Sequence, residues 1–125
     1  MTLPILLSVP HAGLTGPPEA EPYCRVSRED IVADGDEGAA EIYALREHVA
    51  QFVTTEVARA IVDMNRSVDD FSRDGVIKSH TCWNVPVYEP VLPDDLAKGL
   101  LNRYHRPYHD TLSSPLARVR LCVDC

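Results

Sequence analysis

The sequence has no run of basic residues and no long hydrophobic segment. Its formal net charge is −7, from 12 lysines and arginines against 19 aspartates and glutamates. An acidic protein repels nucleic acid and anionic membranes, so we expect neither as a partner. No stretch is long enough for a transmembrane helix. Residues 1–10 contain no basic residue and too few apolar ones for a signal peptide, which predicts a cytoplasmic protein.

Cysteine is also scarce, with 4 in 125 residues, so the fold does not depend on a disulfide scaffold. Cys122 and Cys125 have the spacing of half a zinc knuckle or of a redox pair, but there is no second such pair. We favour two small buried residues on a strand, with a redox protein as the alternative. The remaining composition, 45% hydrophobic and 25% charged, predicts one globular domain over residues 1–125.

The hydrophobic pattern predicts alternating strands and helices. Continuous apolar runs indicate buried strands, and apolar residues at three- and four-residue spacing indicate helices. Residues 14–36 lack such a pattern and are predicted to form a long loop. Pro107 predicts a kink or break near His105 in the second helix. This order predicts an α/β fold with a mainly parallel sheet and helices packed on its faces. The predicted strands are 3–9, 58–64 and 119–125, and the predicted helices are 36–57 and 93–113.

His11 directly follows the first predicted strand, where open α/β sheets usually bind ligands. We predict that it binds a metal ion, the alternative being a structural histidine. Asp36 is predicted either to cap a helix or to be a second metal ligand, and the two roles are compatible. A catalytic zinc ion needs three protein ligands and an open position, so these two residues require a third.

Asn65 and Arg66 follow the second predicted strand. The two-pronged guanidinium of an arginine suits a substrate carboxylate. Asn65 would hold the same carboxylate or the carbonyl group that is cleaved. Asp63, on the same strand face as Asn65, would orient Arg66 or a neighbouring loop.

His105 and His109 lie four residues apart on the second predicted helix. This spacing can chelate zinc, but Arg106 stands where a metalloprotease helix carries glutamate. We therefore favour packing and hydrogen bonding near the cleft for these two histidines.

Three short motifs together resemble the N-formylglutamate amidohydrolase family: Ser-Val-Pro-His-Ala-Gly at 8–13, Asp-Met-Asn-Arg at 63–66 and Pro-Tyr-His at 107–109. Residues 27–30 and 78–82 resemble the family too, so the similarity runs along the whole chain. It implies a partial three-layer α/β/α fold of the phosphorylase/hydrolase-like, zinc carboxypeptidase-like type. The implied reaction is a metal-dependent hydrolysis of an N-acyl amino acid, such as N-formyl-L-glutamate to formate and glutamate during histidine breakdown.

By position, the resemblance implies that His11 and Asp36 bind Zn²⁺ or another divalent metal. It implies that Asn65 and Arg66 hold the substrate carboxylate. The family motif Asp-x-His-Ser begins at Asp124, and its histidine, which would be the third ligand, is absent here. His80, His105 or His109 would have to replace it, and no spacing selects among them. Supporting roles are implied for Asp63, Tyr108, His109 and Asp124.

Family members are considerably longer than this sequence, and no residue is identified as the catalytic base. We therefore expect an exposed apolar sheet edge that a partner chain or a second copy covers. The leading prediction is an amidohydrolase with a small-molecule N-acyl amino acid as its substrate. The alternative is a degenerate, catalytically inactive domain of the same fold that acts as a binding or partner module.

Overall fold

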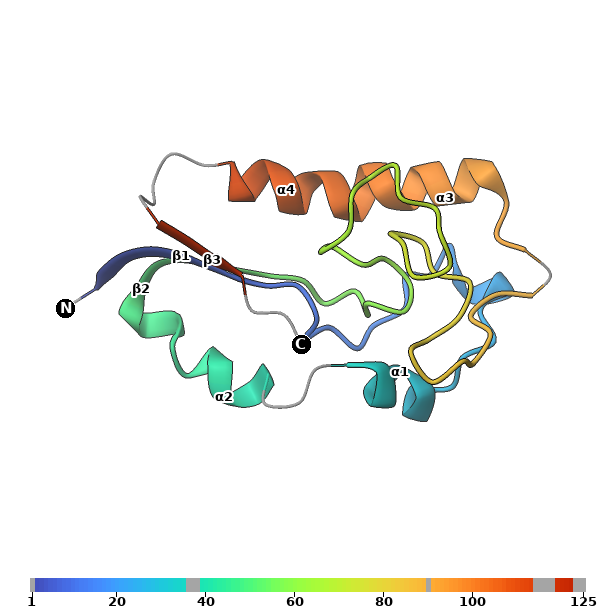
Figure 1. Cartoon of the computed structure of the whole chain (residues 1–125), viewed down its shortest axis with the longest axis horizontal. Helices are drawn as coiled ribbons and strands as arrows, with labels where there is room; N and C mark the ends of the chain where they lie inside the picture. The colour runs from blue at the N-terminus through green and yellow to red at the C-terminus, as the bar shows by residue number, and fades with distance from the viewer. Residues whose placement is uncertain (1, 36–38, 90, 114–118, 123–125) are drawn as a thin grey trace.

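The computed structural model of the chain describes residues 2–35, 39–89, 91–113 and 119–122 (Figure 1). Its strands are β1 (Leu3–Val9), β2 (Val49–Thr54) and β3 (Val119–Cys122). Its α-helices are α1 (Arg28–Asp34), α2 (Ala39–Tyr43), α3 (Asp94–Leu100) and α4 (Arg106–Leu112). Two short 3₁₀ turns, η1 (Glu21–Tyr23) and η2 (Arg46–His48), and one π-helical turn, η3 (Leu101–His105), complete the described elements.

The strands form a parallel sheet in the order β2-β1-β3. Leu7 of β1 pairs with Phe52 of β2 on one side and with Leu121 of β3 on the other. As the central strand, β1 buries Leu6 and Val9 almost completely. The predicted strand Leu3–Val9 and the predicted α/β fold with a parallel sheet are confirmed. The third predicted strand begins at Val119 as expected, and its last three positions, 123–125, lie outside the described residues.

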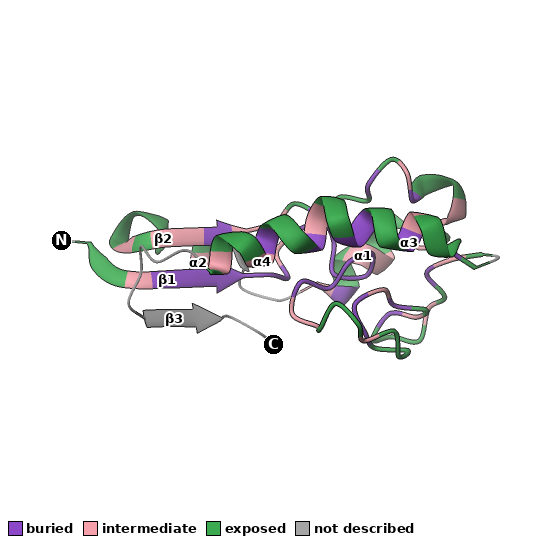
Figure 2. Ribbon diagram, turned by 90° about the horizontal axis from the view of Figure 1, so that it is seen from above, coloured by how far each residue is buried: buried purple, intermediate pink, exposed green. Residues whose placement is uncertain are grey.

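Helices α3 and α4 lie along one side of the sheet, with α2 and α1 on the other side (Figure 1). Figure 2 shows α4 running over β1 and β2. The buried helix residues Leu100, Leu101 and Tyr108 pack in one core with Leu6 and Val53 of the sheet. No helix in the described ranges is long and apolar enough to cross a lipid bilayer.

The predicted second helix is confirmed over residues 94–112, and Pro107 does not interrupt it. The chain instead widens into the π-helical turn η3 just before the proline. There the N–H of Arg106 donates to the Leu101 carbonyl, five residues back. A wide turn accommodates a residue that has no N–H to donate, so the helix continues where a kink or break was predicted.

The predicted helix over residues 36–57 is wrong beyond Tyr43. Its second half forms β2, which pairs with the open backbone edge of β1. Val49, Phe52 and Val53 are β-branched or aromatic, and these residue types pack well on a pleated sheet. Strand pairing with β1 therefore overrides a local pattern that also fits helical spacing.

The predicted strand over residues 58–64 is also wrong, although the segment is buried. It forms turns, in which Ile61 and Val62 both donate backbone hydrogen bonds to the Ala58 carbonyl. A short apolar run by itself cannot distinguish a strand from a buried irregular segment. Because this segment continues from the carboxyl end of β2, it still brings residues 63–66 to that end of the sheet.

The predicted loop over residues 14–36 contains the helix α1, which was missed. Ser27 begins it with a capping box: the Asp30 N–H donates to Ser27 Oγ at 3.1 Å, and the Ser27 N–H donates to Asp30 Oδ2 at 3.0 Å. A serine followed three residues later by an acidic residue was the signal available in the sequence.

Candidate functional site

His11 lies just beyond the carboxyl end of β1 and is 1% exposed. Residues 13–15, which follow His11, pass close to residues 56–57, and the Thr15 N–H donates to the Glu56 carbonyl at 2.8 Å. A Cβ atom at Gly13 would lie 2.4 Å from the Val57 carbonyl oxygen, so only glycine allows this approach. The sequence thus holds the histidine at the predicted edge of the sheet.

The imidazole of His11 is hydrogen-bonded to a fully buried carboxylate. Its Nε2 atom lies 2.7 Å from Asp63 Oδ1, and the same oxygen accepts the Asn65 N–H at 2.9 Å. Lys78 Nζ lies 3.1 Å from the other oxygen, Asp63 Oδ2. Burial by itself would raise the pKa of Asp63. The hydrogen bond from His11 and the charges of His11 and Lys78 outweigh it and hold this pKa well below its usual range.

The sequence did not single out Lys78 as a site residue, although segment 78–82 contributed to the family resemblance. Its side chain is 1% exposed, and its Nζ atom also lies 2.5 Å from Asp74 Oδ1. The spacing of Asp74 and Lys78 does not reveal that the fold also buries this lysine against Asp63. Only its position in three dimensions shows that it neutralises this part of the site.

Arg66 is tied to its own loop by hydrogen bonds from three nitrogen atoms. Nε donates to the Asp74 carbonyl at 2.9 Å, Nη2 to Asp74 Oδ2 at 3.3 Å, and Nη1 to the Asn65 carbonyl at 3.1 Å. Asp63 was predicted to orient Arg66 or a neighbouring loop. Its side chain holds the loop at Asn65, while the carboxylate that contacts the guanidinium belongs to Asp74.

His105 and His109 hold the same loop from the opposite side. Their Nε2 atoms donate to the Arg66 carbonyl at 2.8 Å and to the Met64 carbonyl at 2.7 Å, with ring centroids 4.3 Å apart. Burial lowers the pKa of His105, which favours the neutral ring. This is the hydrogen-bonding role that the sequence favoured for these two histidines.

Tyr108 connects the helix to the sheet near the same edge. Its hydroxyl group lies 2.7 Å from Ser8 Oγ and donates to the Val53 carbonyl at 3.2 Å. It therefore positions α4 over β1 and β2, and its hydroxyl group is buried away from solvent.

Asp36 and Asp124 lie outside the described residues. Gly35 is the last described residue before Asp36. A Cβ atom added at Gly35 would lie 3.8 Å from the His11 carbonyl oxygen. The preceding residue, Asp34, is buried and accepts the Cys82 N–H at 2.8 Å, with Arg59 Nε at 3.6 Å from its other oxygen. These contacts hold the end of α1 beside His11.

Within the described ranges, no three His, Cys, Asp or Glu side chains gather closely enough to hold a metal ion. His80, an alternative ligand from the sequence, has its Nδ1 atom 2.9 Å from Ser79 Oγ. His11 itself fits a zinc ligand, because metal-binding histidines usually donate their second ring N–H to a carboxylate. Because Nε2 is the atom that contacts Asp63, a metal would be bound through Nδ1.

Three comparisons relate this chain to known proteins. A family model described as N-formylglutamate amidohydrolase matches residues 3–125. The N-formylglutamate deformylase of Pseudomonas putida is 32% identical over 129 residues, which cover 94% of this chain and 47% of that protein. The crystal structure of N-formylglutamate amidohydrolase from Ralstonia eutropha JMP134 superposes with a TM-score of 0.71 at 24% identity. That match covers 90% of this chain and 47% of the other, so the chain spans about half the length of these relatives.

Proposed function

Because the chain belongs to the N-formylglutamate amidohydrolase family, we propose that it serves the hydrolysis of an N-acyl amino acid such as N-formyl-L-glutamate. The observation that carries this proposal is His11, placed just after the central strand with its Nε2 atom bonded to a buried carboxylate. That arrangement suits a metal ligand at the edge of the sheet where ligands bind. The proposed complete fold is three-layered and similar to that of zinc carboxypeptidases.

His11, through Nδ1, and Asp36 are the residues proposed to hold a zinc ion or another divalent metal. The approach of Gly35 to His11 supports this pair, since Asp36 is the next residue. When bound, zinc supplies a Lewis acid that polarises an amide carbonyl and activates water for attack. A catalytic zinc site needs a third protein ligand, which lies outside the described residues in this proposal.

Asn65 and Arg66 are proposed to hold the carboxylate of the substrate. Their loop is anchored by Asp63 on one side and by His105 and His109 on the other. A guanidinium fixed in this way binds a carboxylate without having to be ordered first, which strengthens binding. The loop is therefore proposed to hold the Arg66 guanidinium at a constant distance from His11.

An inactive binding module of the same family is the second candidate. It is favoured by His105 and His109, which the sequence offered as replacement metal ligands and which donate hydrogen bonds to backbone carbonyls. Such a module would keep the carboxylate-binding loop and would bind an N-acyl amino acid without hydrolysing it.

A formate-release assay with N-formyl-L-glutamate, with and without added zinc, separates the two candidates. The hydrolase predicts zinc-dependent release that falls about 100-fold or more in His11→Ala, because a metal ligand is lost. His48→Ala is the matched control, since His48 is exposed on the turn η2, away from β1's carboxyl end. Equal rates in the wild type and in His11→Ala contradict the hydrolase. Calorimetric binding of the substrate without formate release would support the module.

A further inference from the structure

A continuous chain of side-chain contacts joins His11 to Arg66. Asp63 Oδ1 lies 2.7 Å from His11 Nε2, and Asp63 Oδ2 lies 3.1 Å from Lys78 Nζ. Asp74 Oδ1 lies 2.5 Å from the same Lys78 nitrogen, and Asp74 Oδ2 lies 3.3 Å from Arg66 Nη2. Each carboxylate thus uses a separate oxygen for each of its two neighbours. We call this set the charge network, and its members are His11, Asp63, Lys78, Asp74 and Arg66.

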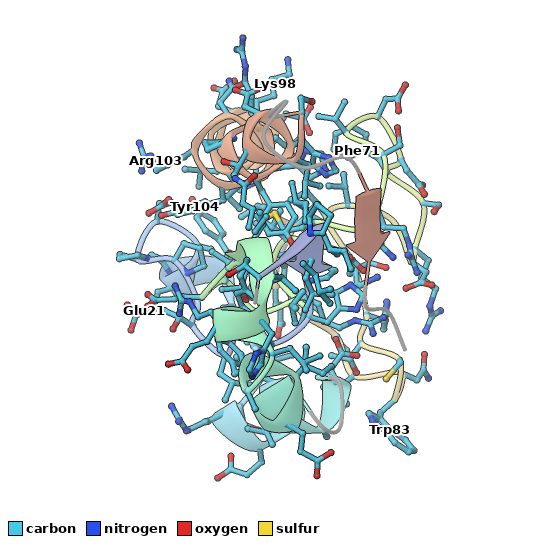
Figure 3. The ribbon with its side chains drawn as sticks, turned by 90° about the vertical axis from the view of Figure 1, so that its left-hand side faces the viewer. Glu21, Phe71, Trp83, Lys98, Arg103 and Tyr104 are labelled. Carbon is cyan, nitrogen blue, oxygen red and sulfur yellow. The ribbon has the colours of Figure 1, made fainter. Side chains whose placement is uncertain are left out.

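Asp74 lies at the end of the charge network that faces solvent. Its side chain is 69% exposed and that of Arg66 is 28% exposed, whereas that of Lys78 is 1% exposed. Figure 3 shows Phe71, from the same loop as Asp74, on the side of the molecule away from Arg103. A ligand in solution therefore reaches the charge network at Asp74 and Arg66.

The backbone fixes the position of Asp74. A Cβ atom at Gly75 would clash with the Asp70 carbonyl oxygen, so only glycine lets the chain turn back this closely. The Val76 N–H donates to the same carbonyl at 2.7 Å, and the Val76 carbonyl accepts the Asp63 N–H at 2.9 Å. These bonds join the turn to the segment that carries Asp63, so both carboxylates of the charge network belong to one framework.

Asp74 is shared between two cations. The hydrogen bond from Lys78 holds the pKa of Asp74 below its usual range, so this carboxylate is ionised near neutral pH. Arg66 donates one N–H of Nη1 to the Asn65 carbonyl and one of Nη2 to Asp74, which leaves one N–H on each nitrogen for a ligand. An anion bound there offsets part of the guanidinium charge, so Asp74 is then attracted more strongly to Lys78.

We propose that Asp74 is a positioning residue that transmits the binding of a carboxylate at Arg66 to His11. The inference rests on the proposed function, which it deepens by linking the residue that holds the substrate to the one that holds the metal. Because the charges alternate in sign along the charge network, an anion at Arg66 weakens the pull of Lys78 on Asp63. Asp63 then accepts more strongly from His11, which raises the basicity of a metal-binding histidine. Substrate and metal therefore strengthen each other's binding, since such a coupling is reciprocal.

The test is an NMR experiment on the whole chain without metal, which follows the ring nitrogen signals of His11 and the Nε–H signal of Arg66. Asp74→Asn removes the charge of Asp74 and keeps its backbone carbonyl, which accepts the Arg66 Nε–H at 2.9 Å. Lys78 then acts on Asp63 alone, so we expect the His11 signals to shift. Acetate added to the wild type should shift them in the opposite direction, because it weakens the pull of Lys78 on Asp63. In Asp74→Asn, acetate should move the Arg66 signal and leave the His11 signals in place.

Asp69→Asn is the matched control, because Asp69 is an exposed aspartate a few residues before Asp74 and bonds to Ser67 Oγ. It should leave the His11 signals at their wild-type positions. Identical His11 signals in Asp74→Asn and the wild type would overturn the inference, as would equal shifts in the two aspartate variants. A response of His11 to acetate that persists in Asp74→Asn would also overturn it.

The same titration separates this inference from the proposed function. Acetate that moves the Arg66 signal but not the His11 signals of the wild type would overturn the inference and leave the proposed function standing. Acetate that moves neither would overturn both the inference and the carboxylate-binding role of Arg66. The predicted shifts in a protein that releases no formate would support the inference and count against the hydrolase.

Discussion

Two charged clusters lie at the short loop at 64–66, and they differ in their access to water. The first, His11, Asp63 and Lys78, is at most 1% exposed, and the Asp63 carboxylate lies 2.7 Å from His11 Nε2 and 3.1 Å from Lys78 Nζ. The second, Arg66 and Arg106, opens onto a groove, and Arg66 retains 28% exposure. A buried charge has to be paired within the protein, whereas water solvates an exposed cation until a ligand binds to it. The first cluster therefore positions atoms, and the second is suited to bind a ligand.

Removing Asp63 is the change with the largest expected effect on this comparison. Asp63→Ala leaves Lys78 buried without one of its two carboxylates and removes the acceptor of His11 Nε2. We expect the free energy of unfolding to fall by about 3–5 kcal/mol, measured by urea denaturation. Arg106→Ala, in the exposed cluster, should change it by less than about 0.5 kcal/mol. Similar losses in the free energy of unfolding of both variants would contradict the view that only the buried cluster depends on pairing within the protein.

Removing a buried hydrogen bond between neutral groups should lower the free energy of unfolding by an amount between those of Asp63→Ala and Arg106→Ala. Tyr108→Phe removes the hydroxyl group that joins α4 to Ser8 and to the Val53 carbonyl. We expect a loss of about 1 kcal/mol in the free energy of unfolding. The matched control is Tyr43→Phe, since the Tyr43 hydroxyl bonds to Thr54 Oγ1 at 3.0 Å in an exposed setting. A larger loss in Tyr43→Phe than in Tyr108→Phe would contradict the importance of burial.

The smallest expected effect is a change in the pH dependence of stability. Burial lowers the pKa of His105 below its ordinary value of 6.5, so the unfolded chain binds a proton more readily than the folded one. Stability should therefore be complete above pH 6.5 and decrease as the pH falls toward the lowered pKa. His105→Gln, which keeps a donor for the Arg66 carbonyl, should remove this decrease.

Asp63 provides the contrast at lower pH. Its pKa lies below the ordinary value of 3.8, so its contribution to stability is complete above that pH and is lost only as the pH falls further. Denaturation measured between pH 7 and pH 4.5 should thus report the contribution of His105 without that of Asp63. A pH dependence in this range that persists unchanged in His105→Gln would contradict the assignment to His105.

Local patterns predicted the elements that have one apolar run or one apolar face against their neighbours. The apolar run Leu3–Val9 pairs with a strand on both edges and is buried from Leu6 onward, and the helix at 94–112 has one apolar face against the core. The pattern failed at 36–57 and 58–64, where a strand and a buried turn exchange places relative to the prediction. In both segments the outcome depended on which residues could pair with β1, and spacing along the chain does not contain that information.

The sequence by itself determined the family and the place of His11, because a motif and the strand before it are local features of the chain. It also marked Asn65 and Arg66 as polar groups at the edge of the sheet. Only the tertiary structure decided that Asp63 faces His11, that Lys78 neutralises it and that Asp74 orients Arg66. These contacts join residues from separate segments, and buried charges find their partners only when the fold excludes water around them.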